Sequence, residues 1–246
     1  MSQRGSVHLA RRGRAGCDHA EGYMELDHIF VLTTADTPEL TALLALGLVP
    51  TYRREHRGQG TANVCFCFDN AFLELLWVTS PHETESPSVA RMQLGRRGAW
   101  RQTGASPFGL AWRVDPGANP GIATWSCAPP YLPAGVAIEV AEDSDDVRQP
   151  LMFSFPGARA PREWPSARRG TLQQGAGYER LEVTSLALTR GCVPSPSLRR
   201  LAAAIGMSVE TSATPTTEIE LRLHGHAEVP ERRLRFPGPT LVNSSR

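Results

Sequence analysis

The most informative hydrophobic pattern in the chain lies in residues 71–78 (AFLELLWV), where a single carboxylate, Glu74, interrupts an apolar run. Side chains alternate across a β-strand, so Glu74 shares a face with Phe72, Leu76 and Val78. Both faces are apolar, which is typical of a strand buried inside a sheet. A carboxylate buried there is costly unless it is paired, protonated or bound to a metal. The pattern therefore predicts a partner for Glu74.

A second buried strand offers that partner. Residues 26–32 (LDHIFVL) are apolar apart from Asp27 and His28. The period of two places His28 on one face with three apolar residues, Leu26, Phe30 and Leu32. We expect the side chains of His28 and Glu74 to meet around a metal ion. The alternatives are a core histidine bonded to the backbone and a buried acid paired with an arginine or a backbone amide.

The pattern around these two strands predicts a strand–helix–three-strand unit. A helix should start at Thr37-Pro38, with Thr37 as N-cap and proline at the first helical position, and stop at Gly47. The predicted strands of this unit are 25–33, 48–55, 64–68 and 71–78.

Further along, strands are predicted over 106–114, 136–140 and 151–155. The long Gly- and Pro-rich connection 115–135 carries aromatic residues and is expected to form an ordered lid. The order of the first unit then recurs: strand 181–189, a helix from Ser195-Pro196 to Gly206, and strands 207–211, 218–224 and 232–236. Such an internal repeat indicates two related modules.

These patterns divide the chain into five expected parts. They are a disordered leader (1–23), a first βαβββ module (24–80), a connecting segment with additional strands and a loop lid (81–156), a linker (157–178) and a second, degenerate βαβββ module (179–240). The leader is polar and Arg-rich without the apolar core of a secretory signal, and Met24 is an alternative first residue. The expected fold class is α+β, with paired modules forming a cup-like mixed sheet.

Composition narrows the function classes. The 246 residues are 41% hydrophobic and 21% charged with a formal net charge of +1, as in an ordinary globular protein. This balance favours neither nucleic acid nor a membrane surface as a partner. The cysteine count of five is odd, and Cys65 and Cys67 share one strand face, either as small buried residues or as a Cys-x-Cys metal site. We expect a reducing, cytoplasmic location.

The matching pieces 26–29 (LDHI), 58–63 (GQGTAN), 72–75 (FLEL), 150–153 (PLMF) and the late unit from Leu181 resemble the vicinal oxygen chelate superfamily. The closer likeness is to its glyoxalase-like branch, of the glyoxalase, bleomycin resistance and dioxygenase type. The resemblance implies that His28 and Glu74 hold a divalent metal, Zn, Fe, Mn or Ni, in the cup. Open metal positions would bind a substrate through adjacent oxygens.

The second module departs from that pattern. Thr184 aligns with His28, and the last strand, residues 232–236, contains no glutamate. Glu139, a carboxylate in the apolar strand 136–140, is the nearest analogue of Glu74 and is taken as a further candidate ligand.

Other residues complete the expected site. His56 is either a third ligand or general base, or a solvated loop histidine. Asn63 closes a loop at the mouth of the cup. Four aromatic residues could wall an apolar pocket or belong to the plain core: Trp77, Phe108, Trp112 and Tyr131.

Two functions follow from this. The first is a metal-dependent isomerase, lyase or ring-opening dioxygenase acting on a small oxygen-bearing molecule, with His28 and Glu74 as ligands and Glu74 and His56 as catalytic groups. The second is a metal-free protein of the same fold that sequesters a small ligand. Exposed module edges are compatible with a homodimer.

Overall fold

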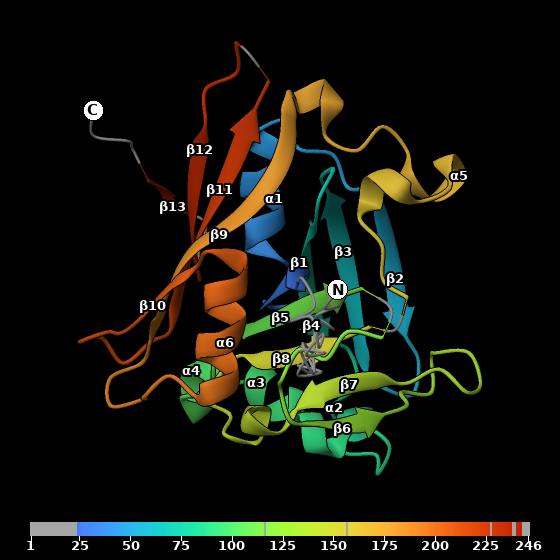
Figure 1. Ribbon diagram of the computed structural model, residues 1–246, viewed down its shortest axis with the longest axis vertical. Coiled ribbons are helices and arrows are strands. Elements are labelled where there is room, and N and C mark those ends of the chain that lie inside the picture. Colours follow the sequence, from blue (N-terminus) through green and yellow to red (C-terminus); the bar gives the residue numbers. More distant parts are fainter. Residues whose placement is uncertain (1–23, 116, 156, 227, 238–239, 243–246) are drawn as a thin grey trace, which may run out of the picture.

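The computed structural model describes residues 24–115, 117–155, 157–226, 228–237 and 240–242, so the expected leader lies outside the described residues. The chain forms two β-sheets, one of eight strands and one of five. Figure 1 shows the five-stranded sheet in orange and red on one side of the molecule, with the eight-stranded sheet beside it.

The eight-stranded sheet has the order β2-β3-β4-β1-β5-β8-β7-β6. Its central pair, β1 and β5, is antiparallel, and each of the two pairs with the last strand of its own half in parallel: β1 with β4, and β5 with β8. The two halves therefore repeat one topology. The strands are β1 Met24–Leu32, β2 Tyr52–His56, β3 Thr61–Cys67, β4 Phe72–Val78, β5 Phe108–Val114, β6 Thr124–Cys127, β7 Ile138–Ala141 and β8 Leu151–Ser154.

The second half of this sheet therefore comes from residues 108–154, and not from the late unit that the sequence pattern suggested. The α+β class and the paired modules are confirmed, but the second module lies earlier in the chain. The structure shows no helix between β5 and β6 in the described residues, so the strand–helix pattern that marks the first module is missing there.

The late unit forms the separate five-stranded sheet, in the order β10-β9-β11-β12-β13. Its element order repeats that of the first module, but its pairing does not. β9 lies between β10 and β11, whereas β1 pairs with the last strand of its module. The strands are β9 Tyr178–Leu188, β10 Ser208–Thr211, β11 Glu218–Gly225, β12 Arg232–Phe236 and β13 Thr240–Val242.

The helices are short. Ser195 caps its helix as expected, since its side chain accepts a hydrogen bond from the Leu198 amide, whereas Thr37 has φ +41° and makes no capping bond. No helix among the described residues has the length and apolar character needed to cross a bilayer. The helices are α1 Pro38–Ala45, α2 Pro81–Thr84, α3 Leu94–Gly98, α4 Trp100–Thr103, α5 Ser166–Arg169 and α6 Pro196–Ile205, with 3₁₀ turns η1 Ala90–Met92, η2 Glu142–Asp145, η3 Pro161–Glu163 and η4 Gln174–Ala176.

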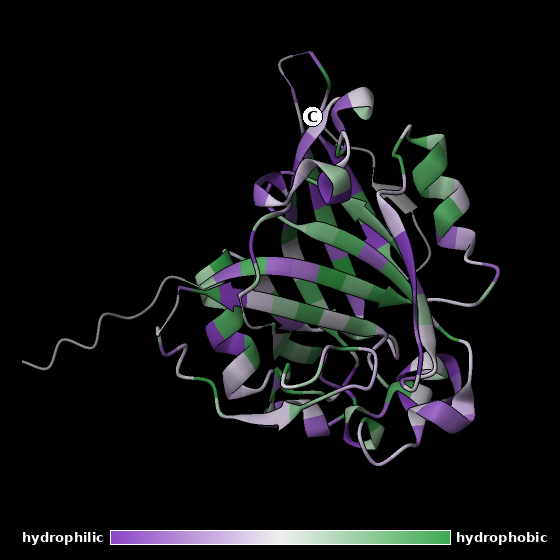
Figure 2. Cartoon of the chain, turned by 90° about the vertical axis from the view of Figure 1, so that its right-hand side faces the viewer, coloured by the Kyte–Doolittle hydropathy of each residue, from purple (hydrophilic) through white to green (hydrophobic). Residues whose placement is uncertain are grey.

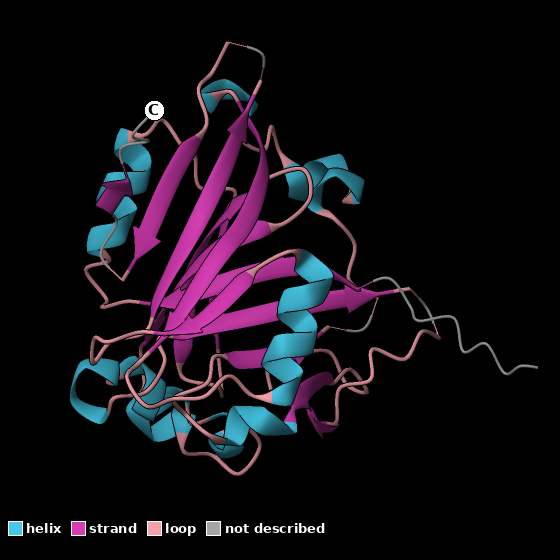
Figure 3. Ribbon diagram, turned by 60° about the vertical axis from the view of Figure 1, so that its left-hand side comes forward, coloured by secondary structure: helices cyan, strands magenta, loops and turns pink. Residues whose placement is uncertain are grey.

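The main hydrophobic core lies between the two sheets. Leu73 and Leu75 of β4 meet Leu186 of β9 and Leu221 of β11 in one cluster, which α6 joins through Leu201. Figure 3 shows the strands of the two sheets crossing, and Figure 2 shows apolar residues in green along the strands. One face of the eight-stranded sheet is thus fully covered, which leaves the other face for a site.

A buried arginine, Arg97, connects the helical segment after β4 to the segment that precedes β8. The guanidinium of Arg97 donates to the carbonyls of Met92, Ser144, Val147 and Gln149 and is fully buried. Burial lowers its pKa to about 10. These bonds satisfy the guanidinium and fix η1 and α3 beside the turn before β8.

The contact between the two halves of the sheet yields a stability prediction. A Cβ added at Gly109 would lie 2.0 Å from the buried ring of Phe30. Gly109→Ala should therefore displace that ring and lower the free energy of unfolding by about 1–3 kcal/mol. Gly175→Ala is the matched control, because its added Cβ meets nothing within 4 Å. Urea denaturation measures the free energy of unfolding of both variants, and an equal change in the two would contradict the expected clash.

Candidate functional site

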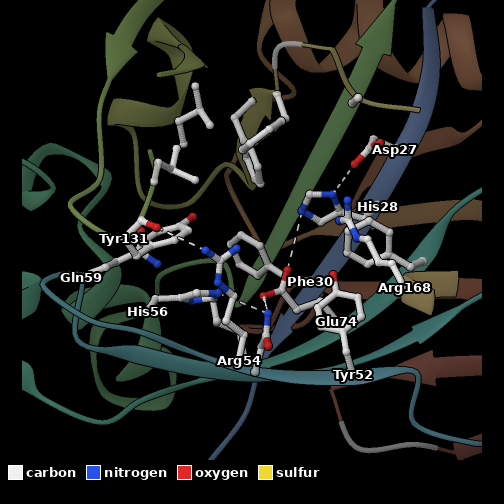
Figure 4. Close-up of a pocket in the computed structure, with 18 of the residues that line it drawn as sticks. Asp27, His28, Phe30, Tyr52, Arg54, His56, Gln59, Glu74, Tyr131 and Arg168 are labelled. Atoms are coloured by element: carbon white, nitrogen blue, oxygen red, sulfur yellow. Dashed lines mark hydrogen bonds and ion pairs between the residues drawn. The ribbon is translucent and has the colours of Figure 1, made fainter. Parts of the chain in front are cut away.

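A cavity of about 830 Å³ opens on the face of the eight-stranded sheet that points away from the main core. Its walls come from β1, β2, β3 and β4 on one half, from β7 and β8 on the other, and from the segment after β8. Figure 4 shows polar side chains gathered at its centre. The polar and charged side chains from the first module that line it are Asp27, His28, Tyr52, Arg53, Arg54, His56, Gln59, Asn63 and Glu74.

A β-bulge in β1 turns Asp27 and His28 into this cavity. The register of β1 against β5 shifts between Leu26 and His28. Leu26 consequently packs in the main core, while Asp27 and His28 both line the cavity. The expectation that Leu26 shares the face of His28 was wrong, because a bulge inserts one residue and reverses the alternation.

His28 and Glu74 meet as the sequence predicts. Their closest atoms, His28 Nε2 and Glu74 Oε2, are 3.6 Å apart, and both side chains are buried. The other ring nitrogen of His28, Nδ1, lies 2.7 Å from Asp27 Oδ1. The imidazole is therefore aligned between two carboxylates, and it stacks on Phe72 with the ring centroids 4.3 Å apart.

The Asp27 carboxylate behind His28 is not an isolated charge. Asp27 Oδ2 lies 3.7 Å from Arg113 Nη1, and Arg113 Nη2 lies 2.7 Å from Glu25 Oε2. A carboxylate that accepts from Nδ1–H holds the imidazole in one tautomer, with Nε2 directed at Glu74.

The second oxygen of Glu74 is held by Asn63. The Asn63 amide Nδ2 donates to Glu74 Oε1 at 2.6 Å and also lies 3.4 Å from His56 Nε2. On its other side His56 Nδ1 lies 2.9 Å from Thr61 Oγ1. A hydrogen-bonded chain thus runs from Thr61 through His56 and Asn63 to Glu74, and it leaves Oε2 facing His28.

Burial keeps several groups near the pair in their neutral forms. Desolvation lowers the pKa of His56, so its Nε2 can accept from Asn63 at neutral pH. Burial raises the pKa values of the Tyr52 and Tyr131 phenols, with the nearby Glu74 carboxylate adding to both shifts. The Tyr131 ring also packs against His56, with the ring centroids 4.5 Å apart and the planes inclined by 31°.

The remaining predicted residues divide into two groups. Asn63, His56 and Tyr131 line the cavity together with His28 and Glu74. Glu139 does not line it: it accepts a hydrogen bond from Thr124 Oγ1 at 3.0 Å, while its neighbour Ile138 faces the cavity. Trp77, Phe108 and Trp112 belong to the main core on the opposite face of the sheet.

Several lining residues carried no signal in the sequence. Tyr52 stands in a short strand of otherwise charged residues, and Trp164 and Arg168 lie in the segment taken for a linker. Cys65 and Cys67 are free and buried beside Tyr52, and burial raises the pKa of both thiols, that of Cys67 to about 12. This supports the interpretation of Cys65 and Cys67 as small buried residues.

The donor set does not fit a resident divalent metal. In the described part of the chain no group of three His, Cys, Asp or Glu side chains could hold one, whereas open catalytic sites usually supply three protein ligands. On the second half of the sheet, the cavity face carries Gly109 and Ala111 of β5 and Leu151 and Phe153 of β8. Thr184 lies in the other sheet, bonded to Glu220.

Residues 26–142 match the profile of the glyoxalase-like domain family. No curated protein matches the chain. Among solved structures, a methylmalonyl-CoA epimerase in complex with methylmalonyl-CoA and NH4+ is 17% identical, covering 55% of this chain and 97% of its own, with a TM-score of 0.35.

Two further solved structures are similar to the chain. A Streptomyces coelicolor methylmalonyl-CoA epimerase variant in complex with 2-nitronate-propionyl-CoA is 17% identical over 55% of this chain and 97% of its own, with a TM-score of 0.37. A hypothetical protein from Staphylococcus aureus is 12% identical over 80% of both chains, with a TM-score of 0.39.

The buried neutral His56 predicts a pH dependence of stability. Its pKa in the folded protein lies below the ordinary value of 6.5, so on acidification the unfolded chain binds a proton that folded His56 does not. Its contribution to stability is full above about pH 6.5 and is lost as the pH falls towards the lowered value, by at most about 1.4 kcal/mol per pH unit. Urea unfolding at about pH 7.5 and about pH 5.5 measures the loss, which should be smaller in His56→Gln. An equal loss in both proteins would contradict the assignment.

Proposed function

Because residues 26–142 form a glyoxalase-like domain of the vicinal oxygen chelate superfamily, we propose that the cavity is the active site of an enzyme that moves a proton within a small bound molecule. Isomerases and lyases perform such steps. The observation that supports this best is the buried His28–Glu74 pair at the centre of a cavity with apolar walls.

Glu74 takes the role of general base. Asn63 holds Oε1, and Oε2 faces both His28 and the cavity. The surrounding walls include Phe30, Phe72 and Phe153, and electrostatic interactions of the carboxylate with a bound molecule are stronger in such a low-dielectric site. A C–H proton next to a substrate carbonyl would pass to Oε2, leaving the electron pair on the substrate as an enolate.

His28 takes the role of proton donor. With Nδ1–H donating to Asp27, Nε2 carries the lone pair and faces Glu74 Oε2, so it takes up the proton that Glu74 removes from the substrate and then serves as the donor. Returning a proton from Nε2 or from Oε2 to another atom of the substrate completes an isomerisation. Delivering it to a leaving oxygen completes an elimination. His56 acts through Asn63 in this scheme and is a positioning residue.

A second candidate is metal-dependent chemistry at the same place. It is favoured by the convergence of one imidazole and one carboxylate on the cavity, which are two of the three protein ligands that such a site usually has. Ring-opening oxygenation belongs to this candidate alone. A protein that only sequesters a ligand is the remaining alternative. The homodimer and the cytoplasmic location expected from the sequence stay predictions.

The general-base role predicts the effect of one substitution. Glu74→Gln keeps the side-chain size but removes the proton acceptor, so proton exchange should fall by about 10²–10⁴-fold. The measurement is deuterium incorporation from D2O, followed by NMR, across a panel of small 2-oxo acids, β-keto acids and thioesters. Glu139→Gln is the matched control, because Glu139 is half-buried in a strand but does not line the cavity.

The outcomes separate an enzyme from a binding protein. Exchange in the wild type and in Glu139→Gln, lost in Glu74→Gln, supports the proposal. A panel member that binds wild type and Glu74→Gln equally and never exchanges would count against it and favour sequestration.

Metal content separates the two enzymatic candidates. With two protein ligands in the cavity, we expect far less than one metal ion per chain in protein purified without chelator or metal-affinity tag. Elemental analysis by mass spectrometry measures this. One Zn, Fe, Mn or Ni per chain, lost in both His28→Ala and Glu74→Ala, would replace the proposed mechanism with the metal-dependent one.

A further inference from the structure

The mouth of the cavity carries an excess of positive charge. Four exposed arginines contribute to its lining, against one exposed acid, Glu163. Within the described residues, none of the four forms an ion pair with a carboxylate, although Arg57, Arg91 and Arg148 elsewhere on the surface each do. The four are Arg53 and Arg54 of β2, and Arg159 and Arg168 from the segment after β8.

Two of these arginines are held in place by aromatic rings. The Arg168 guanidinium carbon lies 3.7 Å from the centroid of the Trp164 ring. The Arg54 guanidinium carbon lies 4.9 Å from that of the Tyr131 ring, and its Nη2 donates to the Tyr131 carbonyl at 3.2 Å. Stacking restrains a guanidinium while most of its N–H donors stay free for a planar oxyanion.

Charge inside the cavity sets the direction in which an anion would bind. The Glu74 carboxylate repels an anionic group, whereas the arginines at the rim attract it. In Figure 4 Arg54 and Arg168 lie to either side of the His28–Glu74 pair. An anionic substrate would therefore keep its charged group at the rim and present its uncharged part to Glu74.

The uncharged part meets an apolar wall. Met92, Leu94, Ile138 and Leu151 line the cavity and belong to one buried cluster. A cavity of about 830 Å³ exceeds what a two- or three-carbon acid would fill. The walls therefore suit a molecule with a sizeable aromatic or aliphatic body.

We propose that the substrate is an amphipathic organic anion, with an apolar body against this wall and an oxyanion group at the rim, attracted by the charges of Arg54 and Arg168. This proposal names the substrate class of the active site proposed above and rests on that site. Arg54 and Arg168 are specificity-determining residues in it, and Glu74 keeps its role in the proton transfer.

A pair of dyes that differ in one charged group tests the proposal. 8-Anilinonaphthalene-1-sulfonate carries an oxyanion, and N-phenyl-1-naphthylamine has the same ring system without it; both fluoresce in apolar sites. Arg54→Gln and Arg168→Gln should each weaken sulfonate binding by roughly three- to fivefold, and together by roughly tenfold or more. The affinity for the neutral dye should change by less than about twofold in the same variants.

The controls remove similar arginines elsewhere. Arg57→Gln removes a β2-adjacent arginine that does not line the cavity, and Arg101→Gln removes one stacked on Trp100 at 4.1 Å. Neither should change the affinity for either dye. Leu132 lines the cavity from a loop, so the larger side chain of Leu132→Trp should narrow it. Weaker binding of both dyes to this variant would show that they bind in the cavity.

Three results would overturn the proposal: no sulfonate binding to the wild type, sulfonate binding unchanged in the double variant, or an equal loss in the controls. Glu74→Gln should keep or strengthen sulfonate binding, because it removes a negative charge. Arginine-dependent sulfonate binding in a protein that shows no proton exchange would leave the recognition proposal standing and refute the enzymatic one. Proton exchange that requires Glu74, together with dye binding that does not depend on Arg54 or Arg168, would support the enzymatic proposal and refute the recognition proposal.

Discussion

The arrangement of the cavity depends on the burial of one carboxylate. Glu74 is 6% exposed in a strand whose neighbours are apolar, and a carboxylate there is stable only with donors at hand. Asn63 supplies one donor and His28 faces the other oxygen. These partners come from the two strands that flank β4 in the sheet, so the backbone pairing itself delivers them.

The two halves of the eight-stranded sheet share a topology but not a chemistry. The half formed by β1–β4 places carboxylates, imidazoles and an amide in the cavity, while the half formed by β5–β8 places Ile138, Leu151 and Phe153 there. Gly109 has no side chain, and the Phe30 ring fills the space above it. One half therefore supplies reactive groups and the other an apolar wall.

The His28–Glu74 pair could be predicted from the sequence because it follows from strand alternation and from the cost of burying a charge. Asp27 could not be assigned to the cavity, because its orientation depends on a bulge that leaves no mark in the hydrophobic pattern. Trp77, Phe108 and Trp112 are apolar residues of strands covered on both faces, and the pattern does not tell which face holds the cavity. The arrangement of α6 and its flanking strands resembled a second module, although the strands pair in a different order.

Part of the cavity lies outside the stretch that matches the glyoxalase-like family. His28, Asn63 and Glu74 fall within residues 26–142, whereas Trp164 and Arg168 belong to the connection between the two sheets. That connection passes over the open face of the first sheet before the chain reaches the five-stranded sheet on the other face. The segment that leads to the additional sheet therefore shapes the mouth of the cavity, where a few substitutions could change the bound molecule without disturbing the reactive pair.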